Sequence, residues 1–144
     1  MLNRLSLEAA IYQTLQRAPS SKDAATKIAN TYVDYARLAT VTPIIVPPKA
    51  KALAYTLNFG FNTKTLGGFL SALNTGLATL WPGTPVTGGA VVTYAGTPFI
   101  LKLSSKLKNG ITSRTAAAQI AAALDAATRA VFYVIPPSGP APLS

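Results

Sequence analysis

A near-repeat of one helical segment constrains the fold of this chain more than any other feature. Residues 21–29, SKDAATKIA, recur at 113–121 as SRTAAAQIA. After each copy, a short apolar run ends in two prolines, at Ile44–Pro48 and at Tyr133–Pro137. The pattern predicts a helix-then-strand unit that the chain uses twice. The repeated unit is a scaffold rather than a reactive motif, which favours a building block over a catalyst.

The two copies agree mainly at apolar and helix-capping positions, as a shared fold requires. The aligned apolar pairs are Leu7/Phe99, Ile11/Leu103, Leu15/Leu107, Ile28/Ile120 and Tyr32/Leu124. An internal duplication explains this agreement. The alternative is that alanine-rich amphipathic helices resemble one another by composition. Two copies are too few for a solenoid, which needs about three or more repeats.

Periodicity and turn residues predict the elements of the fold. Helices are expected over 5–16, 20–38, 66–81, 101–107 and 113–129, with Ser20 and Asp23 resembling a capping box at the start of the second one. Strands are expected over 40–46, 53–62, 90–94 and 131–135. The strand over 53–62 is the clearest, because large apolar residues alternate strictly there with small or polar ones.

These elements predict a single compact α+β domain over 1–135, with helices packed on a small antiparallel or mixed sheet. The pseudo-repeat units span about 5–48 and 99–137, and an insert of about 49–98 separates them. The tail 136–144 carries four prolines, so it is expected to be extended and to be neither helix nor central strand. Such a tail could lie across a neighbouring subunit.

The chain has few charged residues, and most of them are basic. Only 12% of the 144 residues are charged, against about 25% in an average soluble domain. Either other subunits cover much of the surface, or a small core carries a surface rich in Ser, Thr and Asn. The net charge of +9 favours anionic neighbours, although the basic residues are scattered.

Few residues could carry chemistry. The chain has no cysteine and no histidine, which excludes disulfides, thiolate catalysis and histidine acid–base work. The carboxylates of Glu8, Asp23, Asp34 and Asp125 are far apart in sequence, so no metal cluster or acid–base pair is visible. Asp34 and Asp125 are instead expected to pair with Arg37 and Arg129 along their helices. We therefore predict no catalytic, cofactor or metal site and no enzymatic activity.

Two groups of residues are candidates for contacts with other molecules. The best basic patch, for an anion or nucleic acid, comprises Lys49, Lys51, Lys102, Lys106 and Lys108, and its alternative is a solvated helix face. The candidate subunit interface comprises Phe69, Leu73, Leu77, Trp81, Pro136 and Pro137.

The segment Thr65–Leu101 carries no charge, which raises the question of a membrane. Its helix, Leu66–Trp81, is shorter than the roughly 20 residues that cross a bilayer. A buried or interface helix is therefore preferred, and insertion into a membrane is the alternative. The N-terminus, Met1–Leu5, lacks the apolar core of a signal peptide.

The first 45 residues resemble short virion structural proteins of tailed bacteriophages. The resemblance depends on Ala24-Ala25-x-x-Ile28-Ala29-x-x-Tyr32-x-x-Tyr35-Ala36, followed by a run rich in Thr and Val. It implies a non-enzymatic particle component in the capsid decoration layer, neck or tail, assembled in the host cytoplasm with many copies of other virion proteins. A basic nucleic-acid-binding module and a membrane-active protein are the alternatives.

Overall fold

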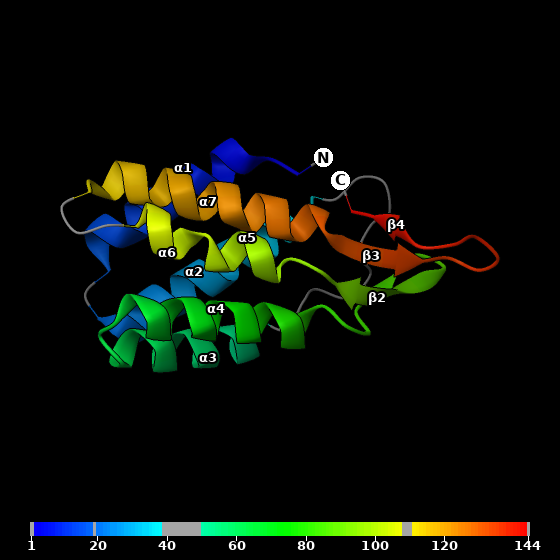
Figure 1. Ribbon diagram of the computed structural model, residues 1–144, viewed down its shortest axis with the longest axis horizontal. Helices are drawn as coiled ribbons and strands as arrows, with labels where there is room; N and C mark the ends of the chain where they lie inside the picture. Colours follow the sequence, from blue (N-terminus) through cyan, green and yellow to red (C-terminus); the bar gives the residue numbers. More distant parts are fainter. Residues whose placement is uncertain (1, 19, 39–49, 108–110, 144) are drawn as a thin grey trace.

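The computed structural model describes residues 2–18, 20–38, 50–107 and 111–143. The helices run along the long axis of the molecule, and a small sheet lies at one end of them (Figure 1). The helices are α1 (Arg4–Arg17), α2 (Ser21–Ala36), α3 (Ala50–Asn62), α4 (Leu66–Leu80), α5 (Thr97–Leu101), α6 (Leu103–Lys106) and α7 (Ser113–Arg129). The strands are β1 (Pro85–Val86), β2 (Gly89–Tyr94), β3 (Val131–Val134) and β4 (Ala141–Pro142). The fold is α+β, as the sequence predicts.

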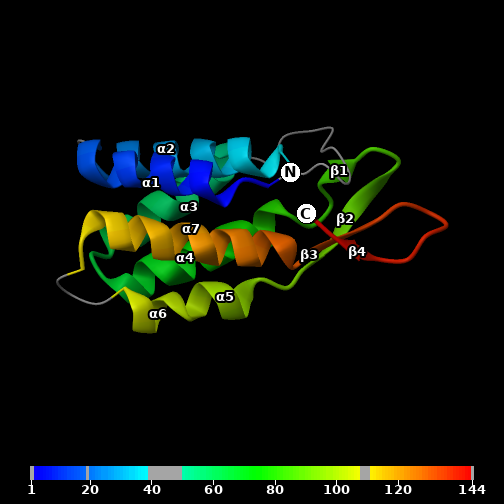
Figure 2. The ribbon, with the colours of Figure 1, turned by 90° about the horizontal axis from the view of Figure 1, so that it is seen from above.

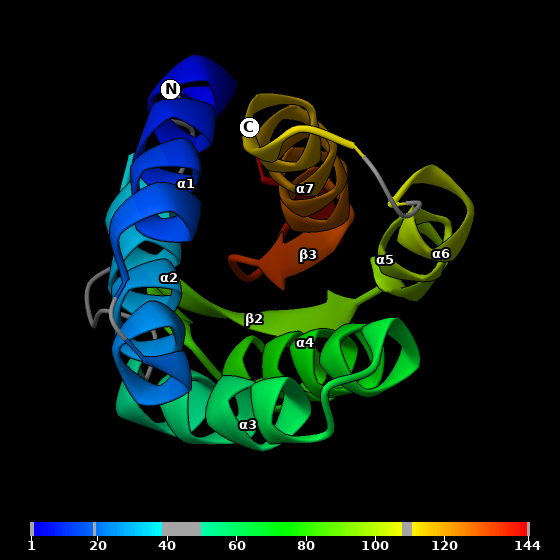
Figure 3. The same cartoon turned by 90° about the vertical axis from the view of Figure 1, so that its left-hand side faces the viewer.

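The helices surround one hydrophobic core. Viewed end-on, α1, α2, α3, α4, the α5–α6 pair and α7 follow one another in a ring, and α7 returns to lie beside α1 (Figure 3). The core draws on both repeat units and on the insert between them, through residues such as Ile11, Tyr32, Leu57, Leu77 and Leu124. Burial of these side chains supplies the main driving force for folding.

The sheet is antiparallel, in the order β1-β2-β3-β4 (Figure 2). β1 and β2 are joined by a tight turn in which Gly88 has a φ of 81°, a conformation that favours glycine. At Gly89 a side chain would collide with β3, because an added Cβ would lie 1.9 Å from the carbonyl oxygen of Val134. The strands expected over 90–94 and 131–135 are confirmed.

The helices of the two repeat units begin with the same capping contact. The Ser20 hydroxyl accepts a hydrogen bond from the amide of Asp23 at 3.1 Å, and the Thr112 hydroxyl accepts one from the amide of Thr115 at 3.2 Å. Each cap satisfies an amide that the first helical turn would otherwise leave unpaired. The helices expected over 5–16, 20–38, 66–81 and 113–129 are confirmed within a few residues, and the one over 101–107 is split between α5 and α6.

The apolar run before Pro47-Pro48 predicts a strand over 40–46. This segment lies outside the described residues. The duplication of a helix-helix-strand unit therefore stays a prediction.

The prediction of a strand over 53–62 is wrong, because these residues form α3. Leu53 and Leu57 lie on an inner helical stripe and are buried, while Tyr55 and Phe59 lie on an outer stripe and are exposed. Each stripe has the four-residue spacing of a helix. Interleaved, the two stripes produce the apparent alternation of a strand.

α3 and α4 approach each other closely at glycines. An added Cβ at Gly60 would lie 2.6 Å from the Cβ of Ala72 on α4, and one at Gly76 would lie 2.6 Å from Cδ1 of Leu53 on α3. Both distances are too short for a side chain without rearrangement. The two helices are therefore held in one register, with the outer stripe of α3 turned away from α4.

The prediction that the tail 136–144 could reach a neighbouring subunit is not supported by its conformation. After a turn in which the Ser138 amide donates to the Ile135 carbonyl, the chain folds back and β4 pairs with β3. The amide of Leu143 donates to the carbonyl of Val131, and the Leu143 side chain is buried. Because Leu143 enters the chain's own core, the described part of the tail folds back on its own sheet, and Ala141–Pro142 form its edge strand.

Candidate functional site

A buried chain of hydrogen bonds joins the two repeat units. Trp81 Nε1 donates to the Tyr32 hydroxyl at 2.9 Å, and this hydroxyl lies 2.6 Å from Oγ1 of Thr128. The Thr128 hydroxyl donates to the carbonyl of Leu124 at 2.7 Å, so the Tyr32 hydroxyl donates to Thr128. The Trp81 indole and the Tyr32 and Thr128 hydroxyls thus each have a hydrogen-bond partner, as buried polar groups require.

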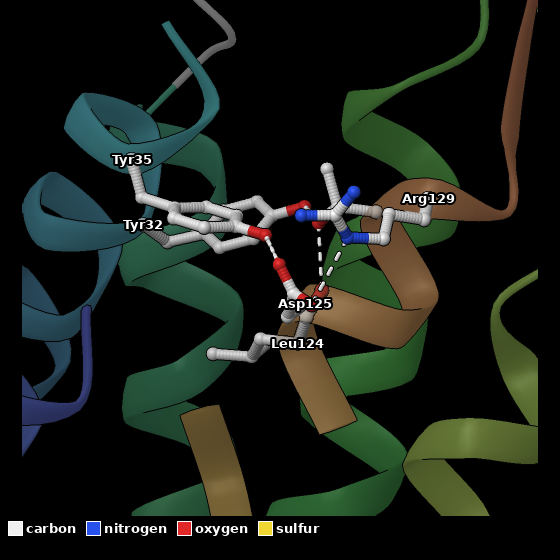
Figure 4. Close-up of polar contacts among 6 residues, drawn as sticks. Tyr32, Tyr35, Leu124, Asp125 and Arg129 are labelled. Atoms are coloured by element: carbon white, nitrogen blue, oxygen red, sulfur yellow. Dashed lines mark hydrogen bonds and ion pairs between the residues drawn. The ribbon is translucent and has the colours of Figure 1, made fainter. Parts of the chain in front are cut away.

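A second polar contact lies beside the first (Figure 4). The Tyr35 hydroxyl donates to Oδ1 of Asp125, and Nε of Arg129 donates to Oδ2 of the same carboxylate at 3.1 Å. Tyr35 comes from α2, whereas Asp125 and Arg129 come from α7. The expected pairing of Asp125 with Arg129 is confirmed.

The other expected pair is also present, since Asp34 and Arg37 lie 3.6 Å apart. Both of its side chains are largely exposed. An exposed pair of this kind contributes little to stability. It marks the outer side of α2 rather than a reactive centre.

The phenols of this cluster are held in the protonated form. Burial raises the pKa of Tyr32 well above its usual value, and burial together with the hydrogen bond to Asp125 does the same for the pKa of Tyr35. A phenol with a raised pKa serves as a hydrogen-bond donor at neutral pH and is a poor base or nucleophile. The cluster therefore acts as a structural tie between α2, the end of α4 and α7.

The candidate basic patch is divided by the fold. Lys51 lies in the first turn of α3, whereas Lys102 and Lys106 lie at α6, and α4 stands between these two places (Figure 3). Lys49 and Lys108 lie outside the described residues. The Lys102 ammonium group is 5.9 Å from the centre of the Phe99 ring. The three described lysines thus do not form one surface.

The prediction of a subunit interface is wrong for three of its six residues. Leu73, Leu77 and Trp81 are buried because the stripe that they form faces the core of their own chain. Phe69 is partly buried and stacks on Phe61 at a centroid distance of 5.1 Å. Pro136 and Pro137 are exposed in the turn before β4, so they alone of this group lie fully on the surface.

A groove of about 370 Å³ runs between α2 and α3, and we call it the α2–α3 groove. It is lined by Lys22, Thr26 and Asn30 from α2 and by Ala50, Lys51, Ala54, Tyr55 and Asn58 from α3. Small side chains from both helices contribute to it, and the two lysines are exposed. The groove combines apolar surface with positive charge.

Tyr55, which lines the groove, belongs to a pair of exposed aromatic residues on α3. Tyr55 and Phe59 are 67% and 59% exposed. Their ring centroids lie 5.0 Å apart at an interplanar angle of 77°, an edge-to-face contact. We call these two residues the outer aromatic pair. In the strand expected over 53–62 these two residues would share one face with Leu53 and Leu57, whereas their four-residue spacing is also a signal for one side of a helix.

Neither metal binding nor a membrane span is indicated for the described part of the chain. Among residues 2–18, 20–38, 50–107 and 111–143, no group of three metal-ligating side chains comes together. No helix within those ranges is long and apolar enough to cross a membrane, and α4, the uncharged central helix, has 15 residues. The candidate functional site is the groove together with the outer aromatic pair, because apolar side chains and exposed lysines lie together there on the surface.

Comparisons with known protein families, with curated proteins and with solved structures found nothing that matches this chain. Any assignment of function depends on the chain's own residues and their geometry.

Proposed function

We propose that this chain is a non-enzymatic structural subunit of a larger particle. The resemblance of its first 45 residues to virion proteins points to a tailed-phage particle, in the capsid decoration layer, neck or tail. In this proposal the α2–α3 groove and the outer aromatic pair contact a neighbouring subunit. The observation that carries the proposal is the exposure of Tyr55 and Phe59 on a helix whose inner stripe already fills the core.

The energetics of the outer aromatic pair support a contact. Full burial of a large apolar side chain contributes about 1.5–3 kcal/mol before the costs of association. Tyrosine is also among the residues that dominate binding energy at interfaces. The pair occupies neighbouring positions on one helix face, so a single partner surface could cover both rings.

The titratable groups support a non-enzymatic role. Asp23, Asp34 and Asp125 each pair with a basic residue of their own helix. The buried phenols keep raised pKa values, which opposes acid–base work near neutral pH. The remaining carboxylate, Glu8, lies alone on α1. Among the described residues, these groups form no acid–base pair for catalysis.

The proposal is tested by purifying virions of the phage whose genome encodes the chain and analysing them by quantitative mass spectrometry. The chain should be present at a fixed copy number relative to the major capsid protein. Its copy number should survive a second gradient purification and a high-salt wash. Presence in infected cells combined with absence from purified virions would refute the proposal.

Nucleic-acid binding is the second candidate function, and the geometry of α5 and α6 favours it. Phe99, Lys102 and Lys106 line a cavity of about 180 Å³ against α7, so two cations and an aromatic ring lie together. Phosphate contacts would make binding salt-dependent. DNA binding that weakens with added salt and disappears in a Lys102→Glu, Lys106→Glu variant would support this function, and an absence of binding at low salt would exclude it.

A further inference from the structure

We infer that the α2–α3 groove binds an acidic amphipathic helical segment of a partner protein. This inference rests on the proposed function, because it names the kind of partner that the particle contact would take. The occupant would place apolar side chains against the outer aromatic pair and carboxylates against Lys22 and Lys51.

The dimensions of the groove suit a short helical segment. Its lining residues run from Lys22 to Asn30 on α2 and from Ala50 to Asn58 on α3. At 1.5 Å per residue, each wall is about 12 Å long, which corresponds to about two turns of a docked helix. Thr26 and Ala54 contribute small side chains between the walls, which leaves room for a ridge of partner side chains.

The charge of the groove selects an acidic occupant. Lys22 and Lys51 are exposed, and within the described part of the chain neither forms an ion pair. None of the described residues that line the groove is acidic. Asp23 follows Lys22 in sequence, but its carboxylate pairs with Lys27 at 3.2 Å. A partner carboxylate would therefore meet a cation that has no competing partner.

The other carboxylates belong to other places in the fold. Asp34 lines a separate cavity between α1 and α2, Asp125 pairs with Arg129 on α7, and Glu8 lies on α1. A second copy of this basic chain would bring like charges together, because the same lysines would lie on both sides of a symmetric contact. Charge thus disfavours self-association through the groove.

The ring geometry favours a protein over single-stranded nucleic acid. Bases that stack on successive aromatic residues need exposed ring faces. Tyr55 and Phe59 meet edge to face, so the edge of one ring covers part of the face of the other. A protein side chain can pack against such a pair from several directions. Asn30 and Asn58 add amide groups that can donate to and accept from a partner's polar groups.

The test uses the full chain and three designed amphipathic peptides of about 16 residues, long enough to form the helix that the groove fits. Each peptide has the same Leu and Phe face, and its flanking positions are all Glu, all Gln or all Lys. Fluorescence anisotropy at low and high salt measures binding. The Glu peptide should bind at least about tenfold more tightly than the Gln peptide, an electrostatic preference that salt weakens.

Variants locate the contact. A Tyr55→Ala, Phe59→Ala variant should lose at least about tenfold in affinity for the Glu peptide, as expected for interface anchors. A Lys22→Glu, Lys51→Glu variant should reverse the preference toward the Lys peptide. The matched control is Lys102→Glu, Lys106→Glu, which changes the net charge equally on another face and should keep the original preference. Far-UV circular dichroism verifies that all variants are folded.

Three results would overturn the inference. One is equal binding of the three peptides, and another is a preference that changes equally in the control variant. The third is that the chain binds an oligothymidylate and not the Glu peptide, and that this binding is lost in the Tyr55→Ala, Phe59→Ala variant. Absence of the chain from virions would refute the particle proposal and leave the peptide result intact, so the two failures can be told apart.

Discussion

Replacing Tyr32 with phenylalanine tests whether the buried hydrogen-bond chain stabilises this fold. The substitution keeps the ring, which packs edge-on against Trp81 at a centroid distance of 6.4 Å, and removes only the hydroxyl. That hydroxyl accepts from Trp81 Nε1 and donates to Thr128. The two partners are affected differently, because Thr128 keeps its own bond to the carbonyl of Leu124.

The expected cost comes mainly from Trp81. Its side chain has no exposed surface, and Tyr32 is the acceptor that the structure gives to its indole N–H. A buried donor left without a partner costs about 1–3 kcal/mol. Thr128 adds little, so we expect Tyr32→Phe to destabilise the fold by about 2 kcal/mol, a large part of the about 5–15 kcal/mol typical of a domain. For a domain of this size, the melting temperature should fall by about 7 °C.

Urea unfolding followed by far-UV circular dichroism measures this cost without depending on the emission of Trp81. Tyr55→Phe is the matched control, because it removes a hydroxyl that is exposed and should change stability by less than about 0.5 kcal/mol. If Tyr32→Phe were as stable as the control variant, another acceptor would have to satisfy Trp81. The hydrogen-bond chain would then not be the tie between the repeat units that its geometry indicates.

Further predictions concern the close packing of α3 on α4 and the buried phenols. Gly60→Ala should destabilise the fold by about 1–3 kcal/mol despite its better helix propensity, because the new Cβ would meet the α4 backbone. Gly67→Ala, where nothing lies within 4 Å of an added Cβ, should leave the unfolding midpoint unchanged or raise it; similar losses at both sites would argue against the close packing. Stability should be fully retained below pH 10 and fall above it, because the folded state keeps protons on Tyr32, Tyr35 and Tyr94 that the unfolded state releases. Absorbance at 295 nm should show these three phenols ionising together with unfolding, and their ionisation in a chain that remains folded would contradict the raised pKa values.

The sequence predicts most of the helices because their signals are local. The capping serine at position 20 and the apolar stripe of α4 are both readable within a few residues of the chain. The sequence does not predict α3 as a helix, because this helix is apolar on two sides. Its inner stripe and the outer aromatic pair together mimic the period of a strand, and only the position of α4 decides which stripe is buried.

The polar cluster and the groove depend on residues that are distant in sequence. Tyr35 and Asp125 are 90 positions apart, and no spacing rule brings them together. The α2–α3 groove likewise combines two helices that a long segment separates. Lys51 and Lys102, by contrast, are expected from the sequence to share one basic patch, but the fold separates them. The ring of helices places α4 between them.

The short outer strands restrict how copies of this chain could join one another. β1 and β4 have two residues each, and each contains a proline, Pro85 and Pro142, which cannot donate a backbone hydrogen bond. Neither outer strand of the described sheet thus offers a long row of unpaired amides to which a strand of another chain could form hydrogen bonds. The successive addition of strands from other chains, as in amyloid, is therefore disfavoured at the edges of this sheet. In the particle that we propose, neighbouring subunits would meet through side chains on the helices, so substitutions could adjust these contacts without exposing backbone amides.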